Sequence, residues 1–262
     1  MFGHLQIYSS YSFQNSTILI KDLIHDASAK HMDALALTDK NNMFGALEFS
    51  EACLKNDIKP IFGMEASVMI ENEIYPFILL AIDDIGYFDL VKVCCDINLH
   101  EEKCISLENL SLYKDHLYIL SGCPEGIVER LIVKEMEDEA VRYLKKFQSL
   151  FQDHYYVMIQ NHRLKLQQTF NERMISLAKY VQIKIVCSNE VSYLKKQDAL
   201  AVDLMQASIH GVTLEAKYEP LTQEKYLKTE SEMQELFSPE IIEETRRVLT
   251  TCRATIPMHD KH

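Results

Sequence analysis

The sequence is poor in glycine and proline and has no tryptophan. It holds 7 Gly and 6 Pro in 262 residues, where average usage of about 7% and 5% would give roughly 31 of the two together. Because the hydrophobic fraction is 47%, a disordered or linker-like chain is excluded. Neither GxxxxGK[ST] nor GxGxxG occurs in the sequence, which removes the common phosphate-cradling loops.

Positive charge is also in short supply. The 27 Lys and Arg residues face 39 Asp and Glu residues, giving a net charge of −12. DNA-binding affinity rests largely on Lys and Arg that neutralise phosphates, so we expect this chain to meet DNA only indirectly. The basic doublets Lys145-Lys146, Lys195-Lys196 and Arg246-Arg247 lie on predicted helices beside acidic neighbours, which indicates solvated helix faces.

Signals for disulfides, membrane insertion and export are missing as well. The seven cysteines are an odd number and include no CxxC spacing, which is typical of a reduced, cytoplasmic chain. No run approaches the roughly 18 apolar residues of a membrane helix, and the first residues lack the pattern of a signal peptide. We therefore expect a cytoplasmic protein without membrane contact.

Seven short apolar runs alternate with helical patterns over the first 195 residues. The continuous apolar run 77–82 is typical of a parallel sheet covered by helices, and the chain length favours a single barrel. Thr169 with Glu172 predicts a capping box, and Asn41 and Asn42 are cap candidates for a helix over about 43–56. The predicted strands lie at about 4–8, 33–38, 58–62, 76–82, 116–120, 154–159 and 183–188.

Beyond about residue 195 the pattern predicts helices alone. Thr229 with Glu232 forms another capping box, and Ser238-Pro239 suits an N-cap and first helical residue. We find no repeat, low-complexity stretch or linker. The economical division is a barrel core over 1–195 and a helical extension over 196–262, packed on the same domain.

The ends of the predicted strands carry the candidate functional residues, because barrel chemistry lies at the C-terminal strand ends. Five residues there could bind a metal, but only one is a histidine, whereas divalent sites commonly combine several histidines with carboxylates. Helix capping, ion pairing and packing are therefore the favoured interpretation. Cys123 has no adjacent base that would make it a nucleophile. The five are Asp39, Glu65, Cys123, His162 and Glu190.

Long stretches of the first quarter match a known family. They read Leu5-Gln6-Ile7-Tyr8-Ser9 with Tyr11-Ser12, DALALTDKNNMFGALEF over 33–49, and IKPIFGME over 58–65. These words resemble the polymerase and histidinol phosphatase (PHP) domain at the N-terminus of bacterial DNA polymerase III alpha subunits. Weaker sequence matches to the same family continue to the last predicted helix, which ends in Cys252. The resemblance implies a distorted seven-stranded βα barrel, in agreement with the seven strands counted independently.

The resemblance also implies a degenerate metal site. In family members with an intact site, a metal cluster at the strand ends supports phosphoesterase chemistry and, in some polymerases, proofreading. Here the site positions fall on Gln6, Tyr8, Asn15, Lys40, Glu65, Pro76, Cys123, Glu190 and Ser192. Only Glu65, Cys123 and Glu190 keep metal-ligand chemistry, so we expect no bound metal, no catalytic residue and no cofactor. Lys40 is expected to pair with Glu65 or Asp39 in place of a metal.

Three hypotheses remain open on function. The first is a catalytically silent PHP module that supports the remainder of a polymerase alpha chain, with proofreading or clamp-associated proteins as further partners and Mg²⁺ needed only by the parent polymerase. The second is an active phosphoesterase or 3′–5′ exonuclease that uses Mn²⁺ or Zn²⁺ in a reorganised site of Glu65, Cys123, His162 and Glu190. The third is a free-standing PHP-like protein that has become a binding or regulatory module.

Overall fold

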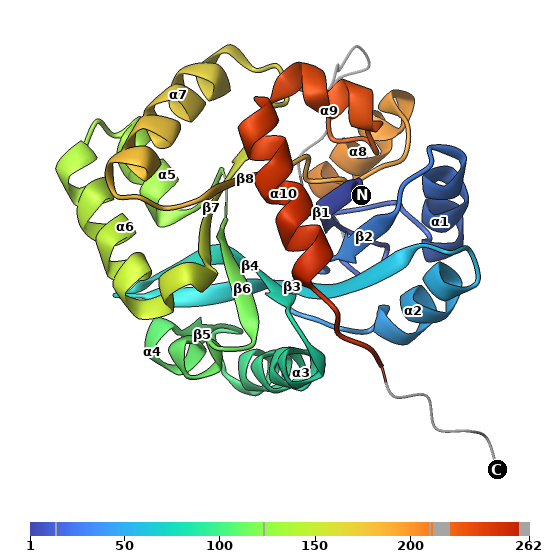
Figure 1. Ribbon diagram of the computed structural model, residues 1–262, viewed down its shortest axis with the longest axis horizontal. Coiled ribbons are helices and arrows are strands. Elements are labelled where there is room, and N and C mark those ends of the chain that lie inside the picture. The colour runs from blue at the N-terminus through green and yellow to red at the C-terminus, as the bar shows by residue number, and fades with distance from the viewer. Residues whose placement is uncertain (14, 123, 210, 212–220, 257–262) are drawn as a thin grey trace.

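A computed structural model describes residues 1–13, 15–122, 124–209, 211 and 221–256, with the backbone alone at Ile209 (Figure 1). In chain order the elements are β1 Gly3–Ile7, α1 Ile20–Ala29, β2 Ala34–Leu37, α2 Ala46–Leu54, β3 Lys59–Ile70, β4 Glu73–Ala81, α3 Asp84–Leu99, β5 Ile105–Ser106, α4 Leu107–Leu110, η1 Ser111–Tyr113, β6 Leu117–Ser121, α5 Ile127–Val133, α6 Glu137–Phe151, η2 Gln152–His154, β7 Tyr155–Gln160, α7 Lys165–Tyr180, β8 Ile185–Ser188, η3 Lys196–Asp198, α8 Ala199–Ile209, α9 Glu230–Leu236 and α10 Pro239–Thr251.

The strands form a nearly closed barrel in the order β1-β2-β3-β4-β6-β7-β8, with helices around the outside (Figure 1). All seven predicted strands are present, which confirms the predicted α/β barrel. The two-residue strand β5 pairs with β3, and it is too short for its pattern to be visible in the sequence.

The expectation of a wholly parallel sheet with a helix after every strand is wrong at β3 and β4. These strands form an antiparallel hairpin that runs from Gly63 opposite Leu80 to Ile70 opposite Glu73, and β4 is also antiparallel to β6. A buried antiparallel strand is as continuously apolar as a parallel one, so the run 77–82 could not reveal its direction. The hairpin turn uses Glu71 at φ 58° instead of a glycine, which hid the turn.

Two of the predicted helix starts are confirmed and two are wrong. Thr229 and Glu232 form the predicted reciprocal capping box of α9, and Pro239 is the first residue of α10. Thr169 lies inside α7, which begins four residues earlier at Lys165, and Gly45 rather than an asparagine precedes α2. The i, i+3 spacing of a capping box also occurs within helices, so it locates a start only where an extended residue precedes it.

The interior of the barrel is filled partly by a helix from the end of the chain. Val248, Leu249 and Cys252 belong to the same buried cluster as Leu5 of β1 and Val186 of β8. Figure 1 shows α10 running across the side where β1 and β8 meet. Within the described residues no strand pairing joins β1 to β8, and the isolated bridge of Ile7 is to Val191, which lies beyond the end of β8. Helix α10 packs against both strands.

Two findings concern the cysteines and the membrane prediction. The six cysteines that the structure describes are all free, with Cys53, Cys104, Cys187 and Cys252 buried. None of the helices in the described ranges is long and apolar enough to cross a membrane.

Candidate functional site

A chain of hydrogen bonds links β7, β1 and β3 at the C-terminal ends of the strands, called the barrel mouth below, and includes the predicted site positions Gln6, Tyr8 and Glu65. The Gln160 amide of β7 donates to Gln6 Oε1 at 2.8 Å, and Gln6 Nε2 donates to the Tyr8 hydroxyl at 2.7 Å. Tyr8 then donates to Glu65 Oε2 on β3. Gln6, Tyr8 and Gln160 are all buried, so these bonds link three strands away from water.

Both carboxylate oxygens of Glu65 have a protein partner, Tyr8 at Oε2 and Lys40 at Oε1. Burial raises the pKa of Glu65, while the Tyr8 hydrogen bond and the Lys40 charge act in the opposite direction. Lys40 Nζ lies 3.7 Å from Glu65 Oε1, so of the two partners expected for Lys40 the structure selects Glu65. The Lys40 side chain is half-exposed, and such a pair contributes little to stability.

A second lysine, which the sequence did not suggest, pairs with the other remaining carboxylate. Lys225 Nζ donates to Glu190 Oε1 at 2.7 Å. Burial works to lower the pKa of Lys225, but the charge and hydrogen bond of Glu190 outweigh it and raise that pKa above its usual range. Each of the two carboxylates at the barrel mouth thus faces an ammonium group.

These residues do not fit a divalent metal cluster. Glu65 and Glu190 are already paired with lysines, and the first-strand positions carry an amide and a phenol. Within the part of the chain that the structure describes, no group of three or more His, Cys, Asp and Glu residues could hold a metal ion. Cys123, a predicted site position, lies outside the described residues.

The remaining predicted positions lie in loops or on β4. Ser192 is buried and donates from Oγ to the Glu190 carbonyl at 3.3 Å. Asn15 donates from its backbone to the Ser12 carbonyl in the loop after β1, and Pro76 lies on β4. His162 is buried with Nε2 3.1 Å from the Asn189 carbonyl oxygen, so this ring nitrogen already has a protein partner.

Asp39 ties down the loop after β1. Its carboxylate accepts from the Ser9 backbone N–H at 2.8 Å, the Ser9 hydroxyl at 2.7 Å and the Ser12 hydroxyl at 2.5 Å. Burial raises the pKa of Asp39, and the hydrogen bonds from Ser12 and Ser9 oppose that rise. All three residues are buried, which makes Asp39 a structural tie in this arrangement.

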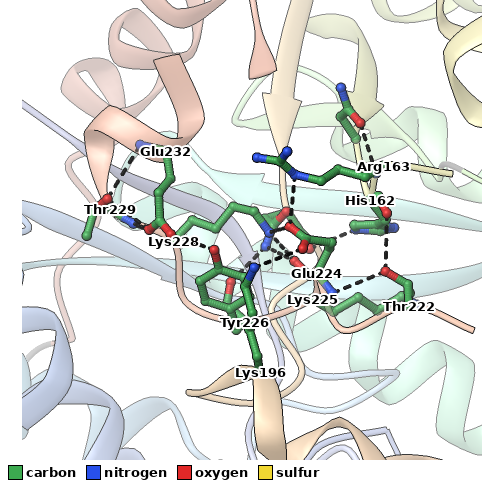
Figure 2. Close-up of polar contacts among 12 residues, drawn as sticks. His162, Arg163, Lys196, Thr222, Glu224, Lys225, Tyr226, Lys228, Thr229 and Glu232 are labelled. Atoms are coloured by element: carbon green, nitrogen blue, oxygen red, sulfur yellow. Dashed lines mark hydrogen bonds and ion pairs between the residues drawn. The ribbon is translucent and has the colours of Figure 1, made fainter. Parts of the chain in front are cut away.

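Lys225 belongs to residues 222–229, defined here as the strap, which runs beside the loop after β8, where the Ser192 N–H donates to the Lys225 carbonyl. Figure 2 shows the polar contacts of the strap. Glu224 lies among three cations, with nitrogen–oxygen distances of 3.1 Å to Lys196, 3.1 Å to Lys228 and 3.5 Å to Arg163. Asn189 Nδ2 donates to the carbonyls of Glu224 and of another strap residue, both at 2.7 Å. Side chains from the loop after β7, the loop after β8 and the short helix η3 therefore fix the strap.

Lys228 is the most deeply buried charge of the strap, with 1% of its side chain exposed. Its Nζ lies 4.0 Å from the centroid of the Tyr226 ring and donates to the Glu224 carbonyl. Burial lowers the pKa of Lys228 to about 8, although Glu224 acts to raise it. Nε2 of His4 lies 2.8 Å from the Lys228 carbonyl oxygen, so the strap is also fastened to β1.

Removing Lys225 is expected to cost more stability than a surface ion pair would. We expect Lys225→Met to lower the free energy of unfolding by about 2 kcal/mol, because Glu190 would remain partly buried without its ammonium. In a double-mutant cycle with Glu190→Gln, urea denaturation should give a coupling energy of about 1–2 kcal/mol. The exposed pair of Glu51 on α2 and Lys55, the residue that caps the end of α2, is the control and should couple by less than about 0.5 kcal/mol. Equal coupling in the two cycles would contradict the assignment.

Comparison with known proteins places the chain in a family. A family model described as the PHP domain matches residues 4–162. The chain belongs to the PHP domain family. The family resemblance predicted from the first-quarter motifs is thereby confirmed.

The curated relatives of this PHP domain chain are DNA polymerase III alpha subunits. The subunit from Borreliella burgdorferi is 30% identical over 96% of this chain and 24% of its own length, and that from Rickettsia bellii is 32% identical over 96% and 22%. The chain thus spans about a quarter of the length of these relatives. A candidate metal-dependent phosphoesterase of known structure from Bifidobacterium adolescentis superposes with a TM-score of 0.44 over 72% of this chain and 86% of its own, at 10% identity.

Proposed function

We propose that this chain is the PHP module of a DNA polymerase III alpha subunit and that the module is catalytically silent, supporting the remainder of the polymerase. The likeness to such subunits over 96% of the chain supports the first part. The second part is carried by one observation, the pairing of both remaining site carboxylates with lysines. Proofreading or clamp-associated proteins are further proposed partners, with DNA contacted indirectly.

The chemistry of the barrel mouth supports the silent role. Metal-dependent phosphoesterases need a metal to lower the pKa of water and to stabilise the charge that develops on phosphorus. Here Tyr8 and Lys40 hold Glu65, and Lys225 holds Glu190. A divalent ion would have to displace two ammonium groups to reach the same oxygens, which makes its binding unfavourable.

Metal binding and phosphodiester cleavage test the proposal directly. The purified chain, titrated with Mn²⁺ and with Zn²⁺, is expected to bind neither at stoichiometric levels that depend on Glu65. Cleavage of bis-p-nitrophenyl phosphate should be no faster for the wild-type chain than for Glu65→Ala. The control is Glu73→Ala, which removes a largely exposed carboxylate of the same hairpin.

Two results would overturn parts of the proposal. Stoichiometric metal binding and cleavage that are lost in Glu65→Ala but kept in Glu73→Ala would favour the phosphoesterase or exonuclease alternative. A natural polypeptide that contains this chain and shows no template-directed primer extension would contradict membership in a replicative polymerase.

A further inference from the structure

We propose that the outer face of α3 is the surface on which the remainder of a DNA polymerase III alpha chain docks against this domain. This inference rests on the proposed function and assigns it a contact surface. The face is an apolar stripe of Ile85, Phe88, Val91, Cys95 and Leu99, called the α3 stripe below.

The α3 stripe is apolar along most of the length of the helix although it faces solvent. The exposed fractions are 54% for Ile85, 51% for Phe88, 36% for Val91 and 86% for Leu99, and Cys95 is also exposed. The spacing of i, i+3, i+6, i+10 and i+14 keeps these side chains near one line of the helix surface. Single exposed apolar residues are ordinary, but a continuous apolar stripe on a helix is typical of a protein interface.

The opposite face of α3 already packs on the barrel, so the helix is apolar on two sides. Leu90, Val93 and Ile97 are fully buried in the main core. The charge within the stripe is compensated, because Lys92 donates to Asp89 at 2.8 Å. Asp96, which follows Cys95, accepts from the Tyr113 hydroxyl at 3.3 Å. A docking partner would therefore meet an apolar stripe whose neighbouring charges already have protein partners, as suits an interface with an apolar centre and a polar rim.

The segment after α10 indicates which partner would cover the α3 stripe. Arg253 donates from its backbone to the Ile82 carbonyl at 2.7 Å, and Thr255 N–H donates to Asp84 Oδ1 at 2.7 Å. Ala254, between them, is buried. The chain is thus led to the first turn of α3, beside Ile85. Residues 253–255 therefore lie alongside the stripe, and the matched relatives, about four times longer than this chain, have further chain of the kind that we propose covers it.

A second copy of this chain suits the surface less well. The net charge of −12 makes self-association costly, because like charges on two copies repel each other. The experiment below includes the second copy as an outcome.

Cys95 provides a native reporter for the docking. Its thiol is exposed, Cys94 is half-buried, and the other described cysteines are buried. Maleimide labelling followed by peptide mass spectrometry should modify Cys95 quickly in the 262-residue chain. In the full-length polypeptide the same thiol should react at least about tenfold more slowly, because a docked surface limits access.

Variants separate docking from general effects on folding. Phe88→Asp in the full-length polypeptide is expected to return Cys95 labelling toward the rate of the 262-residue chain. The control is Leu166→Asp, which alters an 87% exposed leucine at the start of α7 and should leave Cys95 protected. Circular dichroism on each variant checks that the fold is kept.

The possible outcomes are distinct. Equal labelling of Cys95 in the full-length and 262-residue chains, or protection that survives Phe88→Asp, would overturn the docking surface. Protection that grows with the concentration of the 262-residue chain would assign the stripe to a second copy and would also overturn it. Primer extension by the same full-length sample reports on the proposed function, so the two proposals can fail separately.

Discussion

Glu129→Gln is expected to stabilise the protein by about 3 kcal/mol at pH 8.5 and by less than about 1 kcal/mol at pH 5. Glu129 lies in α5 with 1% exposure, and its Oε1 has no hydrogen-bond partner among the described residues. Burial raises the pKa of this carboxyl from 4.5 to about 7, against the effect of its own backbone N–H and of Ser121. The Tyr155 hydroxyl, for which the described part of the chain offers no hydrogen-bond partner, interacts with the Glu129 charge.

The direction of the pH effect follows from proton binding. The unfolded chain releases the Glu129 proton near pH 4.5, whereas the folded chain keeps it until about pH 7. Stability from this group is therefore complete below pH 4.5 and is lost as the pH rises through 7, because the folded state binds more protons in that window. Glutamine is neutral throughout, so the variant lacks this loss.

Urea denaturation of both proteins between pH 5 and 8.5 measures the effect. The control Glu139→Gln changes a glutamate of α6 that is 45% exposed, and its stability should run parallel to that of the wild type. Parallel curves for wild type and Glu129→Gln would show that burial does not perturb this carboxyl.

Asp39→Ala should lower the free energy of unfolding by about 4 kcal/mol. The substitution removes the acceptor for three hydrogen bonds and leaves the Ser9 N–H and the Ser9 and Ser12 hydroxyls buried without it. Hydrogen bonds to a charged group contribute about 1.5–3 kcal/mol each, and buried donors without a partner add a desolvation cost. The loop after β1 should become more mobile, which amide hydrogen exchange of residues 9–12 would detect.

Asp39→Asn is the matched variant, since its amide oxygen can still accept while its NH₂ group cannot. We expect it to lose roughly half as much stability as Asp39→Ala. The losses should be the same with and without added Mn²⁺ or Zn²⁺, because Asp39 acts here as a loop tie. A loss that appears only when metal is present would contradict this role and indicate a ligand.

The sequence predicted the barrel well because its strands are buried on both faces. Runs such as 77–82 are apolar whatever their direction, so they revealed where strands lie but not that β4 runs against its neighbours. The hairpin turn is Glu71-Asn72, and its positive φ falls on Glu71, so the order differs from the Asn-Gly or Asp-Gly pair that usually signals such a turn.

The candidate site was predictable only where local motifs carry it. Short sequence motifs shared with the family locate four site positions, and the structure brings these residues together. They are Gln6, Tyr8, Lys40 and Glu65. Lys225 lies 35 residues from Glu190 in a stretch without periodicity, so nothing in the sequence connected the two. Pairing between such distant polar residues depends on the tertiary fold, which local patterns do not encode.

The contribution of α10 to the barrel interior has a consequence for biosynthesis. Val248, Leu249 and Cys252 pack against strands made at the start of translation, such as β1 and β2. The barrel interior cannot reach its final packing until the ribosome has released the last turn of α10. Until then the apolar side chains of this cluster lack the contacts of α10, and nascent chains with exposed apolar surface are prone to aggregation and are substrates for chaperones.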